Sequence, residues 1–170
     1  MQLEGGALET ARILDNLRRV VRALRTSARD VERQLGIGGA QLFVLSELAA
    51  EPGISIRRLS ERTLTDPSSA SVVAARLVAR RLVARRRDRQ DARRSVLSLT
   101  ARGRALLARA PEPFQVRLVG ALRGLPRARL RRLDLALTEL VRVAGAERGA
   151  APMFFSEESK EPKRRTRRGA

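Results

Sequence analysis

Arginine side chains gather between Arg80 and Arg94, where eight arginines and two aspartates give a net charge of +6. Guanidinium groups at this density bind phosphate oxygens, so DNA is their first candidate partner. Three serines, Ser68, Ser69 and Ser71, precede this run, and their short hydroxyls can bond a phosphate or a base edge. The whole chain carries a formal charge of +18, from 36 Lys and Arg against 18 Asp and Glu. A general arginine bias of the chain is the alternative explanation of that total.

The chain contains no cysteine, histidine, tryptophan or tyrosine. Thiol redox sensing, disulfides, zinc sites built from Cys or His, and a histidine general base are therefore excluded. The acidic residues are scattered beside arginines, as on solvated helix faces, and they form no constellation suited to catalysis. We expect neither an enzyme nor a bound metal or other cofactor.

Two short helices must position the serines. The first is predicted from apolar residues at helical spacing: Ile56, Leu59 and Thr63 to Leu64. Asp66-Pro67 ends it and starts the second, because Asp caps free N–H groups and Pro is tolerated at the first helical position. The second helix has its own apolar stripe, formed by Val72, Val73, Leu77 and Val78. Two amphipathic helices joined at a tight corner are typical of a helix-turn-helix.

A charged hairpin is predicted directly after these helices. Leu82-Val83 leads into the arginine run, and beyond it Val96, Leu97 and Leu99 alternate with serines. This alternation indicates two short strands joined by a charged loop. A hairpin in this position, after a helix that can read DNA, is a wing.

Five segments carry a more specific pattern: Leu59-Ser60-Glu61-Arg62, Asp66-Pro67-Ser68-Ser69-Ala70-Ser71, Arg76-Leu77, Asp91-Ala92-Arg93-Arg94 and Leu99-Thr100-Ala101-Arg102-Gly103. Together they resemble the winged helix-turn-helix of the MarR family of bacterial transcription regulators. The resemblance extends, more weakly, from about Leu8 to Ala144. Two positions depart from the family pattern. Arg81 replaces the glycine usual before the first wing strand, and Ala75 replaces an acidic residue common late in the recognition helix.

The resemblance implies that early residues of the second helix face the major groove. The expected DNA-binding residues on it are Ser68, Ser69, Ser71 and Arg76. Helix capping alone is the alternative role of Ser68 and Ser69.

In the wing, Arg93 matches the family arginine that enters the minor groove, where narrow A·T-rich segments concentrate negative potential. We also expect Arg89 and Arg94 to contact DNA. Phosphates repel a carboxylate, so Asp91 is expected to support the wing by positioning an arginine such as Arg93.

Two apolar seams lie outside the winged region. The first steps by three and four residues through Leu14, Leu17, Val21, Leu24, Ala28, Val31 and Leu35, and ends at Gly36. The last follows Pro126 and runs through Leu130, Leu133, Leu137, Leu140 and Ala144. Such seams need a partner helix, supplied by a second subunit or by the chain's own core. The resemblance implies that these terminal helices interlock in a homodimer.

Between these seams and the winged region, three further features are predicted. Leu42, Leu45, Leu48 and Ala49 mark a helix that Pro52-Gly53 closes. Thr100 is well placed as the N-cap of a helix after the wing. Pro111 and Pro113 should break that helix near Ala110 to Glu112, because each removes a backbone donor and clashes with the preceding turn.

The predicted fold class is therefore mainly α with a small β-wing, a winged helix-turn-helix flanked by N- and C-terminal dimerisation helices. We expect one domain over residues 1–148, with the DNA-binding lobe at 37–100 and the dimerisation helices at 8–35 and 101–146. Residues 149–170 form a basic tail that we expect to be disordered, either adding phosphate affinity or merely solvated. No run has the length of a membrane span, so we expect a cytoplasmic protein without a membrane partner.

These features predict a dimeric, sequence-specific transcription regulator that binds double-stranded DNA at a palindromic operator. The resemblance implies a repressor that a small aromatic or anionic effector releases. Phe43 and Phe114 are the residues that would line an effector pocket, with plain core packing as the alternative. An architectural nucleoid protein that binds DNA by charge and shape is the second functional hypothesis. A protein-interaction module that has lost DNA binding is the third.

Overall fold

The computed structural model describes residues 2–88, 95–147, 153 and 154. It confirms the predicted fold class, because nearly all of its elements are helices and the exception is one two-stranded antiparallel sheet. In chain order the elements are α1 (Gln2–Leu35), α2 (Gly39–Ala50), α3 (Ile56–Thr63), α4 (Pro67–Ala79), β1 (Val83–Arg87), β2 (Ser95–Leu99), α5 (Ala101–Leu107), α6 (Phe114–Arg123) and α7 (Arg127–Val143).

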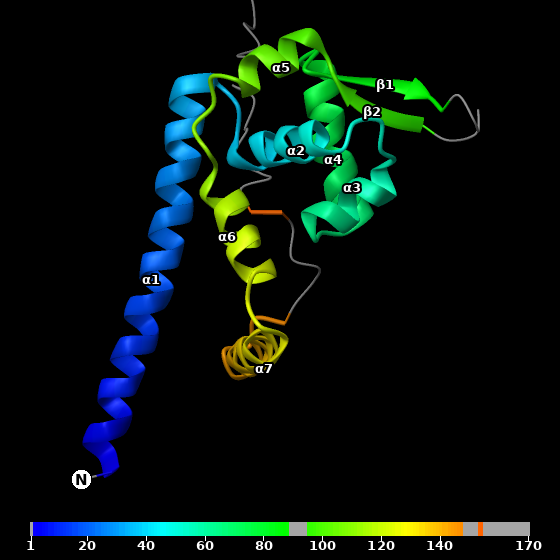
Figure 1. Cartoon of the computed structure of the whole chain (residues 1–170). Helices are drawn as coiled ribbons and strands as arrows, with labels where there is room; N and C mark the ends of the chain where they lie inside the picture. The colour runs from blue at the N-terminus through cyan, green and yellow to red at the C-terminus, as the bar shows by residue number, and fades with distance from the viewer. Residues whose placement is uncertain (1, 89–94, 148–152, 155–170) are drawn as a thin grey trace, which may run out of the picture.

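Helix α2 forms the centre of a compact lobe. It is apolar on nearly all sides, as expected for a helix surrounded by other elements, and residues from Gly39 to Leu45 are all buried. Helices α3, α4 and α5 and the sheet pack around it (Figure 1). Nearly all residues of the hydrophobic core come from the chain between Ile37 and Leu99, and Val31 of α1 and Met153 complete it.

The sheet is a short hairpin whose register pairs Val83 with Leu99 and Arg87 with Ser95. At its base, Val83, Leu97 and Leu99 are buried against the core. The segment before α3 extends this base, because Gly53 N–H donates to the Leu97 carbonyl at 3.0 Å and Leu97 N–H donates to the Ile54 carbonyl at 2.8 Å. The hairpin projects from the lobe with its base fixed at both strands (Figure 1).

Several predicted helix boundaries are confirmed. Gly36 ends α1 with φ 64°, a left-handed conformation that glycine adopts easily. The chain between α5 and α6 is not helical around Pro111 and Pro113, so the predicted break is present. The first helix differs from the prediction in its length, because it begins at Gln2 and continues through Gly5-Gly6.

Helices α1 and α7 extend beyond the lobe (Figure 1). Of the seven residues of the first seam, only Leu24, Ala28 and Val31 are buried. No residue of α7 is buried. A single chain thus leaves most of the outer half of the first seam and most of the second exposed to water; Leu17 and Leu140 are half-buried.

Met153 lies in the segment that we expected to be a disordered tail, yet only 2% of its surface is exposed and it belongs to the hydrophobic core. The chain therefore returns to the lobe after α7. The basic part of the tail, from Lys160 onward, lies outside the described residues. None of the described helices is both long and apolar enough to cross a membrane.

Candidate nucleic-acid interface

Helix α4 begins where the sequence predicts. The Asp66 carboxylate accepts hydrogen bonds from the Ser69 N–H at 2.9 Å and from the Ser69 hydroxyl at 2.6 Å, and the Ser68 hydroxyl also donates to it. Pro67 occupies the first helical position. The hydrogen bonds from Ser68 and then Ser69 hold the pKa of Asp66 well below its ordinary value. Asp66 is thus ionised at neutral pH, and it fixes the start of α4.

This cap engages both serines that we expected to face DNA. Ser68 is exposed and Ser69 is half-buried, and each hydroxyl hydrogen is directed to Asp66. A serine oxygen keeps its acceptor lone pairs when its hydrogen is bonded. Both hydroxyls therefore bond to the capping carboxylate of Asp66, and Ser68 also has an acceptor available at the surface.

The outward face of α4 is less polar than predicted. Its exposed residues recur at helical spacing and are Pro67, Ser68, Val72, Ala75 and Ala79. The prediction placed Val72 in the apolar stripe that faces the core, but half of its surface (50%) is exposed. The buried stripe consists instead of Ala70, Val73, Ala74 and Leu77. Ser71 and Arg76 are half-buried at the edges of the outward face.

Such a face can read bases through apolar contact. Small and branched side chains pack against the thymine methyl group, which the major groove exposes at each A·T pair. Val72 and Ala75 are therefore candidate base contacts that were not predicted from the sequence. Helical periodicity alone could have found Ala75, which lies one turn beyond Ser71 and two beyond Ser68.

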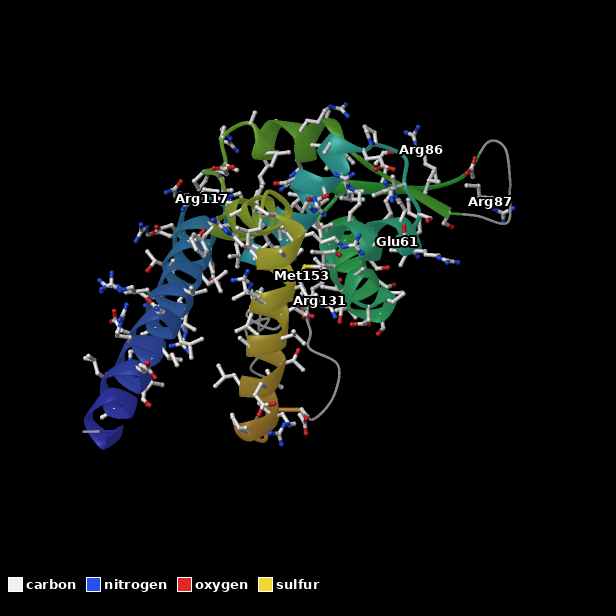
Figure 2. All side chains as sticks on the ribbon, turned by 60° about the horizontal axis from the view of Figure 1, so that its bottom comes forward. Glu61, Arg86, Arg87, Arg117, Arg131 and Met153 are labelled. Carbon is white, nitrogen blue, oxygen red and sulfur yellow. The ribbon has the colours of Figure 1, made fainter. Side chains whose placement is uncertain are left out.

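The wing carries its arginines on β1. Arg85, Arg86 and Arg87 are all exposed, and Figure 2 shows Arg86 and Arg87 toward the outer end of the hairpin. These three arginines belong to the arginine run of the sequence but were not predicted to contact DNA. The strand register places Arg87 at the outer end of the hairpin, paired with Ser95. The expected contacts Arg89, Arg93 and Arg94, and the supporting Asp91, lie outside the described residues.

The base of the wing is held by the segment Leu99-Thr100-Ala101-Arg102-Gly103, a Leu-Thr-x-x-Gly motif. The Thr100 hydroxyl accepts the Gly103 N–H at 3.0 Å, which caps α5 as predicted, and donates to the Arg81 carbonyl at 2.8 Å. A Cβ atom on Gly103 would overlap the Leu82 carbonyl oxygen and lie 3.1 Å from the carbonyl carbon. Only glycine lets α5 pack this closely against the chain that enters β1.

A cluster of ion pairs fixes α3 against α2. Arg62 Nε lies 2.7 Å from Oε2 of the buried Glu47, and Arg62 Nη1 lies 2.8 Å from Oε2 of Glu51. Arg58 donates two further hydrogen bonds to Glu51, both 3.1 Å long. The hydrogen bonds from Arg58, and then from Arg62, lower the pKa of Glu51. Because α3 precedes the turn into α4, this cluster helps to orient the outward face.

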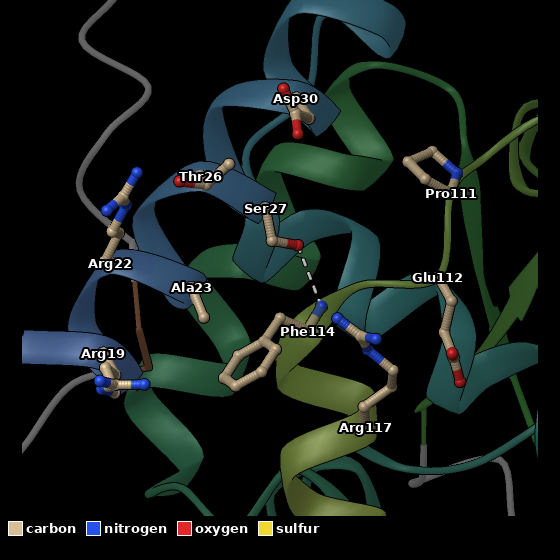
Figure 3. Close-up of a pocket in the computed structure, with 10 residues that line it drawn as sticks. All are labelled: Arg19, Arg22, Ala23, Thr26, Ser27, Asp30, Pro111, Glu112, Phe114 and Arg117. Atoms are coloured by element: carbon tan, nitrogen blue, oxygen red, sulfur yellow. Dashed lines mark hydrogen bonds between the residues drawn. The ribbon is translucent and has the colours of Figure 1, made fainter. Parts of the chain in front are cut away.

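A cavity of about 490 Å³ lies between α1 and α6, away from the wing. Phe114 begins α6, and its N–H donates to the Ser27 hydroxyl of α1 at 3.0 Å (Figure 3). The Arg117 guanidinium lies 5.4 Å from the centre of the Phe114 ring, and Arg22 lines the opposite wall. Two carboxylates, Asp30 and Glu112, also line the cavity, so only the part beside Phe114 and the arginines suits a flat anion.

Of the two phenylalanines expected at an effector pocket, only Phe114 lines this cavity. Phe43 has no exposed surface and belongs to the core. The core alternative therefore holds for Phe43, because the middle of α2 is surrounded by other elements and Phe43 cannot reach a surface cavity. The cationic walls, Arg22 and Arg117, were not predicted.

Comparison with known proteins adds a sequence match and a set of similar structures. The sequence profile of the MarR family matches residues 35–94, which run from the end of α1 through most of the wing. Among curated proteins, none matches the chain significantly in sequence.

Three solved structures are similar in fold. S. aureus MepR in a DNA complex is 20% identical, with a TM-score of 0.53, over 75% of this chain and 94% of that one. BldR from Sulfolobus solfataricus, described as a transcriptional regulator, is 20% identical, with a TM-score of 0.52, over 84% and 99%. Bordetella bronchiseptica BpsR, whose DNA binding is described as regulated by 6-hydroxynicotinic acid, is 26% identical, with a TM-score of 0.51, over 79% and 98%.

Proposed function

Because the chain belongs to the MarR family of winged helix-turn-helix transcription regulators, we propose that it is a cytoplasmic homodimer that binds a palindromic operator. The outward face of α4 carries this proposal. It presents Ser68, Val72 and Ala75 on one exposed stripe, and a recognition helix contacts bases in the major groove through such a stripe. The capped start of α4 and the ion pairs of α3 hold that stripe in a fixed orientation. When it is bound to its operator, the protein acts as a repressor by occupying promoter DNA.

The proposed dimer explains the exposed seams of α1 and α7. One winged lobe reads a half-site, and a two-fold dimer reads two half-sites one helical turn apart. Leucines and valines on α7 are exposed in the single chain, among them Leu130, Leu133, Leu137 and Val141. An apolar surface of this extent on a helix indicates an interface with another chain.

Selection of bound fragments from the host genome tests the function as a whole. The proposal predicts a shared palindrome whose half-sites are centred about one helical turn apart, roughly 34–36 Å. Recovery of fragments with no common sequence would contradict it and would favour the architectural hypothesis.

The wing and the tail are expected to contribute to DNA binding in different ways. We propose that Arg93, which the sequence places between the two wing strands, contacts one groove position, whereas the tail arginines contact phosphates without regard to sequence. Arg93→Ala should weaken operator binding by roughly 1–3 kcal/mol and relax the preference at base pairs beneath the wing. Deletion after Lys160 should weaken operator and random DNA alike, and should reduce the slope of log affinity against log salt by about 0.9 for each lost phosphate contact.

Titrations against operator and scrambled duplex at several salt concentrations measure both effects. Arg109→Ala, an exposed arginine beyond α5, is the matched control and should leave both affinities unchanged. If Arg93→Ala reduces the two affinities equally while the truncation selectively affects the operator, the role assigned to Arg93 is wrong.

We also propose that the cavity between α1 and α6 receives a small aromatic acid that releases the protein from DNA. The ligand described for BpsR, 6-hydroxynicotinic acid, belongs to this class. Its ring would stack on Phe114 and its carboxylate would pair with Arg22 or Arg117. The effector is neither a metal nor an oxidant, because the chain has no His or Cys with which to sense either.

A panel of benzoic and nicotinic acids, with zinc and peroxide added separately, tests this proposal in a DNA-release assay. An acid should release the wild type, and Phe114→Ala and Arg117→Gln should lose that response while their DNA affinity stays unchanged. Arg109→Gln serves as the charge-matched control. Release by physiological zinc or peroxide would contradict the proposal, as would equal release of Phe114→Ala and the wild type.

A further inference from the structure

A second cavity, of about 330 Å³, lies where α1, α4, α5 and the base of the wing meet. Its lining residues are Leu35, Ile37, Ala79, Arg80, Arg81, Leu82, Arg102 and Leu106. It adjoins the C-terminal end of α4, whereas Ser68 lies at the other end. A helix rises 1.5 Å per residue, so roughly 18 Å separates the two ends of this 13-residue helix. The cavity is therefore distinct from the base-reading end of α4 and from the cavity beside Phe114.

Every charged side chain that lines this cavity is an arginine. Arg80, Arg81 and Arg102 bring three positive charges to it, and no carboxylate lines it. Among the described residues, none of the three forms a salt bridge with an acid. The Arg80 guanidinium donates to the Gly36 carbonyl at the end of α1, which leaves its charge uncompensated.

Arg81 occupies a backbone position that suits glycine. Its φ is 58°, in the left-handed region that side chains with a Cβ rarely adopt. Hydrogen bonds hold it there, from its own N–H to the Val78 carbonyl at 2.9 Å and from the Thr100 hydroxyl to its carbonyl at 2.8 Å. Glycine would satisfy the same bonds without strain. The arginine therefore adds something that the fold does not need, namely a third guanidinium at the cavity.

The stability of α5 does not explain why an arginine stands at position 102. Arg102 lies in the first turn of α5, where the helix dipole favours anions and disfavours cations. The dipole does account for a cation at the C-terminal end of α4, and hence for Arg80. It accounts neither for the left-handed backbone of Arg81 nor for the position of Arg102.

From these placements we propose that Arg80, Arg81 and Arg102 form a binding site for a multivalent oxyanion of the phosphate type. Guanidinium groups bind such anions through paired N–H donors, and all three arginines are exposed, so an anion can reach them from solvent. The bound anion would connect the end of α1 to the C-terminal end of α4 and to the base of the wing. It comes either from a free phosphorylated metabolite or from the backbone of bound DNA.

Pyrophosphate is the probe, titrated by calorimetry into the full-length protein at constant ionic strength. The proposal predicts saturable binding of one pyrophosphate per chain, weakened at least tenfold in Arg81→Gly and in Arg102→Gln. Arg81→Gly is expected to fold, because glycine adopts a positive φ without strain. Arg109→Gln removes one exposed arginine elsewhere and should bind pyrophosphate as the wild type does.

Titrations with DNA distinguish the two sources of the anion. If DNA supplies it, pyrophosphate competes with duplex, and Arg81→Gly reduces the salt slope of DNA binding by about 0.9 relative to Arg109→Gln. If the anion is free, pyrophosphate also binds the protein–DNA complex, and Arg81→Gly leaves the salt slope unchanged. The proposal is overturned if Arg81→Gly and Arg102→Gln match Arg109→Gln in both pyrophosphate affinity and salt slope.

Discussion

Leu17→Asp combined with Leu137→Asp should convert the protein from a dimer to a monomer at micromolar concentration. Leu17 lies on the α1 seam and Leu137 on the α7 seam, and 45% of the surface of Leu137 is exposed in the single chain. If these seams pair between subunits, each substitution buries an unpaired carboxylate, which costs several kcal/mol. Since 1.4 kcal/mol changes a binding constant tenfold, the dissociation constant of the dimer should rise at least about a thousandfold.

Light scattering measures the oligomeric state directly. Leu135→Asp is the matched control, because it makes the same chemical change on the same helix but away from the seam, at a position that is 60% exposed. It should leave the dimer intact. A double variant that remains dimeric, or a wild type that is already monomeric at micromolar concentration, would show that the terminal helices do not hold two subunits together.

Gly103→Ala should strongly destabilise the winged lobe, although it adds only one methyl group. The new Cβ would overlap the Leu82 carbonyl, and backbone on both sides leaves no flexible side chain to move aside. Overpacking of this kind costs about 3 kcal/mol or more. For a chain of this length, each kcal/mol lowers the melting temperature by about 2–4 °C, so a decrease of roughly 6–12 °C is expected.

Gly120→Ala makes the same substitution in the middle of α6, where an added Cβ meets nothing within 4 Å. It should be neutral or stabilising, because alanine is the better helix former. Calorimetry measures the melting temperatures of both variants and of the wild type, and so tests both expectations. If Gly103→Ala melts within one or two degrees of the wild type, then the glycine of the Leu-Thr-x-x-Gly motif is not required by the packing of α5 against the wing.

Local chemistry made much of the fold predictable. Asp66 before Pro67 specifies a helix start by itself, and Pro111 with Pro113 prevents helix wherever the chain is placed. The position of Arg81 could be identified from the resemblance, and its positive φ explains why related proteins favour glycine there. These predictions depend on one or two neighbouring residues, so they hold without knowledge of the tertiary structure.

Features that depend on packing were harder to predict. Val72 and Val73 are adjacent on α4, and the sequence does not show which of them faces α2; the structure buries Val73 and exposes Val72. Phe43 could be assigned to the core only once α2 was found to be enclosed. Met153 lies ten residues beyond the end of α7, and no periodicity connects it to the core that it enters.

The ratio of affinities for operator and scrambled duplex, at one salt concentration near physiological, tests the proposed function most directly. A regulator that reads bases through the outward face of α4 and the wing should favour its operator by about a thousandfold or more. An architectural protein with the same charge of +18 would bind both duplexes through their phosphates with similar affinity. A ratio above a thousand is the result we predict, and a ratio near one would contradict sequence-specific regulation by this protein.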